Sequence, residues 1–351
     1  MRNANRRFVL KARPEGIAGP EHFTEEAVAV RSPEPGEVLL ETMYVSVDPA
    51  MRVWVSGNPG YVPRVEIGEV MRAGGIARVV ESRAAGFAAG DLVRASVGWQ
   101  SHPTLPAQGI EKLDLSLGGP LDWLGLLGLT GKTGYFGMRE VGAVRPGETV
   151  LVSGAAGGVG QIAGQVARIE ECRVVGIAGG VDKCAYLAKD LGFDAAIDYK
   201  AEPDLTAAIA RACPNGVDVF FDNVGGPTLD AALANLRVGA RVVICGRVSQ
   251  TASAELLACA ILVSSSASAR ASRDLSCSTT QTATPRRITG WRHRTRRAAC
   301  ISACMCSKIS AARLKVSACR SAARISASSQ CRYRRPQRPE PSRRRADHQQ
   351  H

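Results

Sequence analysis

Three glycines spaced three residues apart follow a short apolar run in the stretch TVLVSGAAGGVGQIAGQVARIEE, Thr149 to Glu171. A strand, a glycine turn and a helix in this order form a cradle for phosphate groups. Gly154 permits the tight turn, Gly157 lets backbone N–H groups approach a pyrophosphate, and Gly160 lets the helix pack closely on the strand. The helix N-terminus adds unpaired N–H groups and the positive end of the helix dipole. The chemistry indicated is the binding of a dinucleotide.

The end of the next apolar run predicts which dinucleotide is bound. An NAD site places an acidic residue there, where it bonds the ribose 2′-hydroxyl. In CRVVGIAGG this place is taken by Gly179 and Gly180, Lys183 follows three residues later, and Tyr199 and Lys200 come after the third run. Small residues and a cation accommodate a 2′-phosphate, so the pattern favours NADP(H). The alternative for Lys183 is a solvated surface residue.

The elements that must position these residues alternate regularly. AAIDY, GVDVFFDNVGG and GARVVICG have the apolar, β-branched composition of buried strands, and DLTAAIARAC and PTLDAALANL separate them as helices. Alternation of strands and helices predicts an α/β fold with a doubly wound parallel sheet.

The N-terminal part has a different pattern. Between residues 8 and 100, short β-rich runs are separated by Gly and Pro, which predicts a compact, barrel-like β domain. Metal ligands are scarce: no Cys precedes Cys172, His22 and His102 are the only histidines before residue 250, and Glu69 has no adjacent His. A zinc site of Cys and His ligands is therefore not expected.

Charge and cysteine divide the chain near residue 250. The whole sequence of 351 residues has a net charge of +13, but residues 1–250 carry 25 Lys and Arg against 28 Asp and Glu. The remaining residues carry 20 basic and 4 acidic side chains, and seven of the 11 cysteines. The chain shows no signal-peptide pattern and no apolar run long enough to span a membrane. A cytoplasmic location with free thiols is expected.

Several stretches together resemble one family. The stretches that carry the resemblance are VSVDPAMR, YVPRVEIGEVMRAGG, LLGLTGKTGYFGM, the glycine-turn segment, VDVFFDNVGG and RVVICGRVS. The chain resembles the zinc-independent medium-chain dehydrogenase/reductases, specifically the NADP-dependent alkenal/one and prostaglandin (leukotriene B4) reductases. The resemblance covers residues 8–249. It implies a GroES-like β domain (1–125), a Rossmann-type NADP-binding domain (126–250) and hydride transfer to the β-carbon of an α,β-unsaturated ketone or aldehyde, followed by protonation of the enolate.

The resemblance also implies roles for individual residues. Gly154, Gly157 and Gly160 would hold the pyrophosphate, and Lys183 and Tyr199 the 2′-phosphate. The remaining implied residues line the cofactor cleft or the substrate pocket: Thr130, Gly131, Asn223, Cys245 and Ser249 for the cofactor, and Tyr44, Met51 and Trp99 for the substrate. Asn223 could instead be a turn amide, Cys245 a buried small hydrophobe, and each substrate-pocket candidate a core residue. The catalytic residue is unknown, because the tyrosine that the family has after Ser249 is absent from CGRVSQTASAE.

Residues 251–351 interrupt the family pattern. Eighteen of their 20 basic residues are Arg. Codons permitted for Asp274 to Arg287, read from the third base of each, give Phe-Val-Val-Leu-Asp-Tyr-Ala-Asp-Arg-Tyr-Pro-Glu-Ala, which resembles the family at this position. Two further windows match in the same frame. We interpret the segment as an out-of-frame translation and expect a disordered or irregular tail with few contacts, leaving Arg241 to Ser249 as an exposed edge strand.

Three alternatives stay open. The first is a quinone reductase of the same superfamily. The second is an enzyme whose Arg-rich tail contacts nucleic acid, which the near absence of aromatic residues disfavours. The third is a chain left inactive by an incomplete fold. The expected partner is a small enone or enal, with neither nucleic acid nor membrane, and a homodimer if the C-terminus were in frame.

Overall fold

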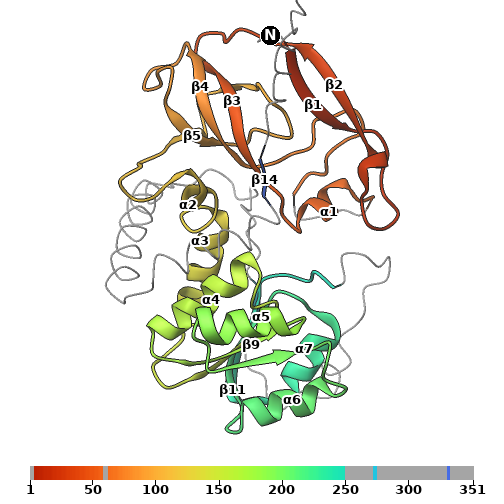
Figure 1. Cartoon of the computed structure of the whole chain (residues 1–351), viewed down its shortest axis with the longest axis vertical. Coiled ribbons are helices and arrows are strands. Elements are labelled where there is room, and N and C mark those ends of the chain that lie inside the picture. Colours follow the sequence, from red (N-terminus) through yellow and green to blue (C-terminus); the bar gives the residue numbers. More distant parts are fainter. Residues whose placement is uncertain (1–3, 58–61, 250–271, 275–329, 333–351) are drawn as a thin grey trace, which may run out of the picture.

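The computed structural model describes residues 4–57, 62–249, 272–274 and 330–332. These residues form two parts, each built around its own six-stranded sheet (Figure 1). Antiparallel strands make up the N-terminal part. The second part has a parallel sheet with helices on both faces, as the sequence predicts.

The N-terminal part contains two antiparallel sheets. One is the hairpin of β1 (Ala4–Leu10) and β2 (Phe23–Ala29), and the other has the strand order β14-β3-β4-β5-β7, with β6 also paired to β3. The remaining elements of this part are β3 (Glu37–Ser46), β4 (Gly75–Ser82), β5 (Leu92–Ala95), β6 (Thr104–Pro106), β7 (Glu111–Lys112), η1 (Pro20–His22), α1 (Met51–Val55) and α2 (Pro120–Leu124).

Backbone hydrogen bonds tie the hairpin to the segment that connects β5 and β6 of the larger sheet. The N–H of Phe8 donates to the carbonyl of Trp99 at 2.9 Å, and the N–H of Ser101 donates to Arg6 at 2.8 Å. Alternate residues of the larger sheet face one core, which includes Val38, Leu40, Ala77, Val79 and Val93. The expected β domain is thereby confirmed.

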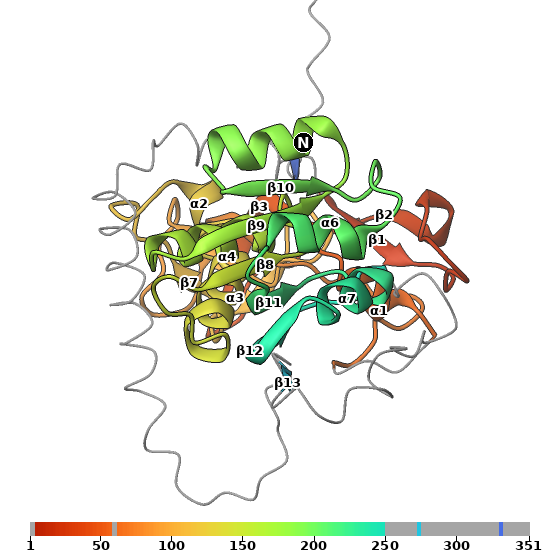
Figure 2. The same ribbon diagram turned by 90° about the horizontal axis from the view of Figure 1, so that it is seen from below.

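The second part is a six-stranded parallel sheet with the order β10-β9-β8-β11-β12-β13. The chain runs outward from β8 in one direction and then in the other, which is the doubly wound arrangement. Figure 2 shows the strands following one another in this order. The elements are α3 (Leu129–Phe136), η2 (Gly137–Val141), β8 (Thr149–Val152), α4 (Gly158–Ile169), β9 (Arg173–Ala178), α5 (Val181–Ala185), η3 (Tyr186–Asp190), β10 (Ala195–Asp198), α6 (Leu205–Ala212), β11 (Val217–Asp222), α7 (Gly226–Leu233), β12 (Leu236–Ile244) and β13 (Ser272–Asp274).

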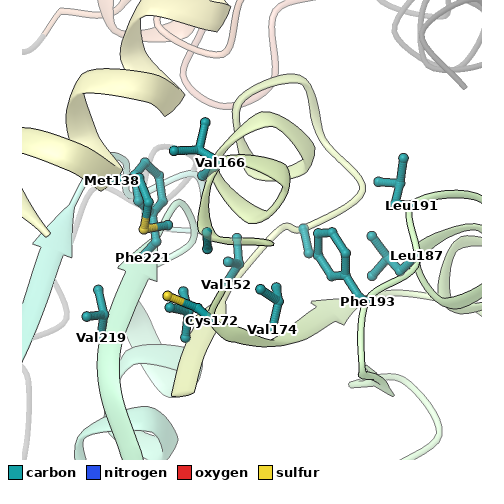
Figure 3. Packing of buried hydrophobic residues seen from close by; sticks show 14 of the residues in the cluster. Met138, Val152, Val166, Cys172, Val174, Leu187, Leu191, Phe193, Val219 and Phe221 are labelled. Atoms are coloured by element: carbon teal, nitrogen blue, oxygen red, sulfur yellow. The ribbon is translucent and has the colours of Figure 1, made fainter. Parts of the chain in front are cut away.

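Successive residues of the central strands enter opposite cores. Val150 and Val152 of β8 pack with α4, while Leu151 between them packs with α6 and α7. The same alternation places Phe221 of β11 in the first core and Phe220 in the second. Figure 3 shows the first core, where Met138 and Phe221 lie on one side and Phe193 on the other. A strand buried on both faces explains the unbroken apolar runs of the sequence.

The structure corrects the prediction of an exposed edge strand. Arg241 to Ser249 was expected to be one strand with a free edge, but β12 spans Leu236–Ile244, and β13 pairs with it in parallel, Val242 opposite Ser272. The backbone groups of these β12 residues therefore have a partner strand. A second segment, β14 (Gln330–Arg332), pairs antiparallel with β3. These two strands, of three residues each, pair with strands of residues 1–249. For the rest of 251–351 the expectation of an irregular tail with few contacts lies outside the described residues.

Candidate functional site

The glycine turn lies between β8 and α4, as predicted. Gly154 has a φ of 56°, in the left-handed region that favours glycine. A Cβ on Gly160 would lie 2.9 Å from the Cα of Ala155, and still closer to the carbonyl oxygen of Gly154. The N–H of Gly157 donates to that same carbonyl at 2.9 Å and closes the turn. The first N–H groups of α4 have no acceptor within the helix, so they are available to a phosphate.

Thr130 and Gly131 lie on α3, which packs against this turn. A Cβ on Gly158 would lie 3.0 Å from Cγ2 of Thr130, so the threonine side chain borders the start of α4. Gly131 is buried against the backbone of Leu126, where no side chain fits. The structure thus brings Thr130 to the phosphate turn and gives Gly131 a packing function.

The ends of β9 and β10 bring Gly179 and Tyr199 together. A Cβ on Gly179 would lie 2.7 Å from Cε1 of Tyr199, so the ring covers the glycine and is itself 49% exposed. Lys183 is exposed on α5, which begins directly after Gly180. The Asp198 carboxylate accepts the N–H of Gly180 at 2.8 Å and that of Lys200 at 3.1 Å, and these bonds hold its pKa below the usual value.

The loops after β11 and β12 bring Asn223, Cys245 and Ser249 together. The Ser249 hydroxyl donates to the carbonyl of Val224 at 2.6 Å, and the N–H of Cys245 donates to the backbone of Asp222 at 2.8 Å. Burial, with a smaller contribution from Asp222, raises the pKa of the Cys245 thiol to about 12. This thiol is therefore neutral at physiological pH.

Sequence reasoning did not single out Ser153 and Asp222, which are both fully buried at this edge of the sheet. The Ser153 hydroxyl donates to the Asp222 carboxylate at 2.7 Å, and the carboxylate also accepts the N–H groups of Val224 at 2.9 Å and Gly225 at 3.0 Å. Burial raises the pKa of Asp222, while the bonds from Gly225 and Ser153 lower it. Each of the two residues stands at the end of a buried strand, but only the sheet makes these strands neighbours, so the sequence carried no signal for the pair.

Two of the three substrate-pocket candidates, Met51 and Trp99, lie at one core, and Tyr44 lies at another. Met51 is 6% exposed and packs in a core that Trp99 borders, and the Trp99 ring lies 5.1 Å from that of Phe23. Tyr44 borders a different core, around Ile76. Packing accounts for the burial of Met51.

No group of three His, Cys, Asp or Glu residues able to hold a metal ion occurs in the described ranges. Over the same residues, no helix is long and apolar enough to cross a membrane.

Two family models match the chain. Residues 6–113 match "N-terminal domain of oxidoreductase", and residues 158–279 match "Zinc-binding dehydrogenase".

Similar proteins cover most of the chain. The NADPH-dependent curcumin reductase of Escherichia coli (strain K12) is 42% identical over 72% of this chain and 73% of its own. The NADP(+)-dependent 2-alkenal reductase of Nicotiana tabacum is 38% identical over 70% of this chain and 74% of its own. The crystal structure of CurA from Vibrio vulnificus in complex with NADPH, 39% identical, has a TM-score of 0.69 over 72% of this chain and 74% of its own.

The two sheets, the glycine turn and these similarities place the chain among the medium-chain dehydrogenase/reductases. Within them it belongs to the zinc-independent, NADP-dependent alkenal/one reductase group, as the sequence motifs indicate.

Proposed function

We propose that this protein uses NADPH to reduce the C=C bond of α,β-unsaturated ketones and aldehydes. The observation that carries the proposal is the similarity to the curcumin and 2-alkenal reductases, which extends through both sheets. In this reaction the hydride goes to the β-carbon and a proton goes to the α-carbon, so a saturated carbonyl compound and NADP⁺ result.

The residues described above fit the dinucleotide. A side chain at Gly160 would collide with the turn, so the space between turn and helix is reserved for backbone. We infer that Gly154, Gly157 and Gly160 hold the pyrophosphate, and that Lys183 and Tyr199 hold the 2′-phosphate, because no acidic side chain occupies Gly179 or Gly180. Thr130, Gly131, Asn223, Cys245 and Ser249 would border the nicotinamide half. When bound, NADPH supplies the hydride.

We propose that residues of the N-terminal part recognise the substrate. Tyr44, Met51 and Trp99 remain candidates for the pocket, and Trp99 offers an indole N–H with no hydrogen-bond partner in the described structure. A carbonyl oxygen that gains charge during hydride transfer needs such preorganised donors.

The reaction is tested by following NADPH absorbance with a medium-chain enone, a saturated ketone and a quinone. We expect oxidation of NADPH with the enone only, with or without a chelator, and one saturated ketone formed per NADPH consumed. Faster reaction with the quinone would favour the quinone-reductase alternative. Alcohol oxidation that a chelator abolishes would contradict the proposal.

We infer two domains that divide close to residue 125. Trp123 and Leu124 pack in the core around Ile76, which belongs to the antiparallel sheet. Beyond them, Gly134 of α3 packs against Ala163 of α4, on the side of the parallel sheet. The GroES-like domain would thus comprise 1–125 and the NADP-binding domain 126–250.

We also propose that residues 251–351 are translated out of frame. The abrupt change in charge and the three frame-shifted windows support this, whereas the family-model match to residue 279 favours an in-frame start of the segment. Sequencing the gene across the codons for Ser249 to Leu256 decides between them. We expect an inserted or deleted base, and a corrected chain with higher solubility and activity. An uninterrupted frame together with a protease-resistant segment would contradict this proposal.

A cytoplasmic location is proposed from the four cysteines of the first 250 residues, all of them free thiols. A homodimer is proposed for the chain with a corrected C-terminus, and light scattering of that chain would test it.

A further inference from the structure

The Ser153–Asp222 pair holds the backbone of Asn223, whose side chain is bound by the backbone carbonyl of Ser153. The Ser153 hydroxyl accepts the backbone N–H of Asn223 at 2.8 Å while it donates to Asp222, so both functions of the hydroxyl are used. The backbone carbonyl of Ser153 accepts the side-chain N–H of Asn223, Nδ2, at 2.8 Å. Asn223 is therefore held to Ser153 by two bonds, and Asp222 fixes the direction of the serine hydroxyl.

This arrangement allows only one orientation of the Asn223 amide. A reversed amide would place its oxygen against the carbonyl oxygen of Ser153, and two acceptors repel each other. The Nδ2 group must therefore face Ser153. Among the described residues, no hydrogen bond reaches the amide oxygen of Asn223, Oδ1, which remains available as an acceptor.

The location of Asn223 connects this acceptor to the dinucleotide. A Cβ on Gly154 would lie 3.5 Å from the Cβ of Asn223, so the asparagine flanks the first glycine of the phosphate turn. β8 and β11 are neighbours in the sheet although β9 and β10 lie between them in sequence. Ligands of doubly wound sheets bind at this switch point, and β11 begins the second half of the fold, which receives the second nucleotide.

We propose that Asp222, acting through Ser153, is a positioning residue for the nicotinamide half of the cofactor. It holds the Asn223 amide so that Oδ1 accepts a hydrogen bond from a hydroxyl or amide N–H of that half. The inference rests on the proposed use of NADP(H). It assigns a function to a buried carboxylate that joins the loops after β8 and β11, while the backbone carbonyl of the same residue accepts the N–H groups of the loop after β12.

The two halves of the cofactor can be tested separately with the full chain. Adenosine 2′,5′-bisphosphate contains the 2′-phosphate and a 5′-phosphate but neither nicotinamide nor its ribose, so it reports on the β9–β10 end and the glycine turn and not on the nicotinamide half. Binding of NADP⁺ and of this fragment is measured by calorimetry for Asp222→Asn and Ser153→Ala. We expect Kd for NADP⁺ to rise about tenfold, the value of one hydrogen bond, and Kd for the fragment to stay unchanged.

Asp204→Asn is the matched control. Its carboxylate also accepts a backbone N–H, that of Ala207 at 3.0 Å, but it caps α6 away from the glycine turn. We expect both ligands to bind this variant as they bind the unchanged protein. If Asp222→Asn fails to fold, Ser153→Ala alone decides, because it keeps the buried carboxylate and its backbone donors.

The outcomes separate the two proposals. If the variants weaken both ligands equally, or lower Tm without changing the NADP⁺ affinity, Asp222 is only structural and the positioning role is wrong. If the unchanged chain binds neither ligand, the proposed cofactor itself is wrong.

Discussion

Replacing Gly160 by Ala is expected to weaken NADPH binding about a hundredfold, because overpacking and a lost charge-assisted hydrogen bond together cost about 2.7 kcal/mol. The added methyl would lie 2.9 Å from Cα of Ala155 and closer still to the carbonyl of Gly154. Both neighbours are backbone atoms, so neither can rotate away. The start of α4 must then move away from β8, and its N–H groups leave the positions in which they meet the pyrophosphate.

A graded comparison tests this cause. A Cβ on Gly157 would lie 3.1 Å from the Gly154 carbonyl, a milder contact, so Gly157→Ala should lose less affinity. Gly74 has no heavy atom within 4 Å of the added Cβ, and Gly74→Ala should bind NADPH normally. Fluorescence titration with NADPH gives the three affinities, and circular dichroism shows whether each variant is folded. Equal affinities for a folded Gly160→Ala and Gly74→Ala would contradict the assigned function of Gly160.

The parallel strands and the glycine turn could be predicted because their signals are local. Gly154, Gly157 and Gly160 are recognisable from their spacing, and the alternation of strands and helices indicated the parallel sheet. The pairing of β13 with β12 at the edge of the parallel sheet was not predictable in this way. β13 is three residues long and pairs with a strand about 30 residues earlier in the chain, and such a short segment has no periodicity to detect.

The polar pair beneath the site illustrates a second limit. Ser153 and Asp222 are 69 residues apart in sequence and meet only because β8 and β11 become neighbours. Either residue alone resembles an ordinary strand-ending turn. Met51 is a further case: its place in a family motif predicts a substrate contact, and its burial in the core around Leu10 is a tertiary property that the motif alone does not indicate.

Lys183→Ala is expected to weaken NADPH binding about tenfold to a hundredfold, the value of about 1.5–3 kcal/mol for a hydrogen bond to a charged group, and to leave NADH binding unchanged. NADH has no 2′-phosphate, so it makes no use of the ammonium group. The Asp198 carboxylate makes the Lys183 cation more important for binding the 2′-phosphate. Its pKa is lowered by hydrogen bonds from Gly180 and Lys200, so it remains ionised at the same end of the sheet, where it repels a phosphate.

Lys189→Ala is the matched control, since Lys189 is also exposed but lies six residues further along, on η3. It should leave the ratio of NADPH to NADH affinity unchanged.

Because Lys183 is exposed, salt should screen its contribution, and the preference of the unchanged protein for NADPH should fall as ionic strength rises. Tyr199 acts differently, through a ring that covers Gly179, so Tyr199→Ala should weaken NADPH with little dependence on salt. Equal loss of NADPH and NADH affinity in Lys183→Ala would assign the lysine to the solvated surface and leave the preference for NADPH to Gly179, Gly180 and Tyr199.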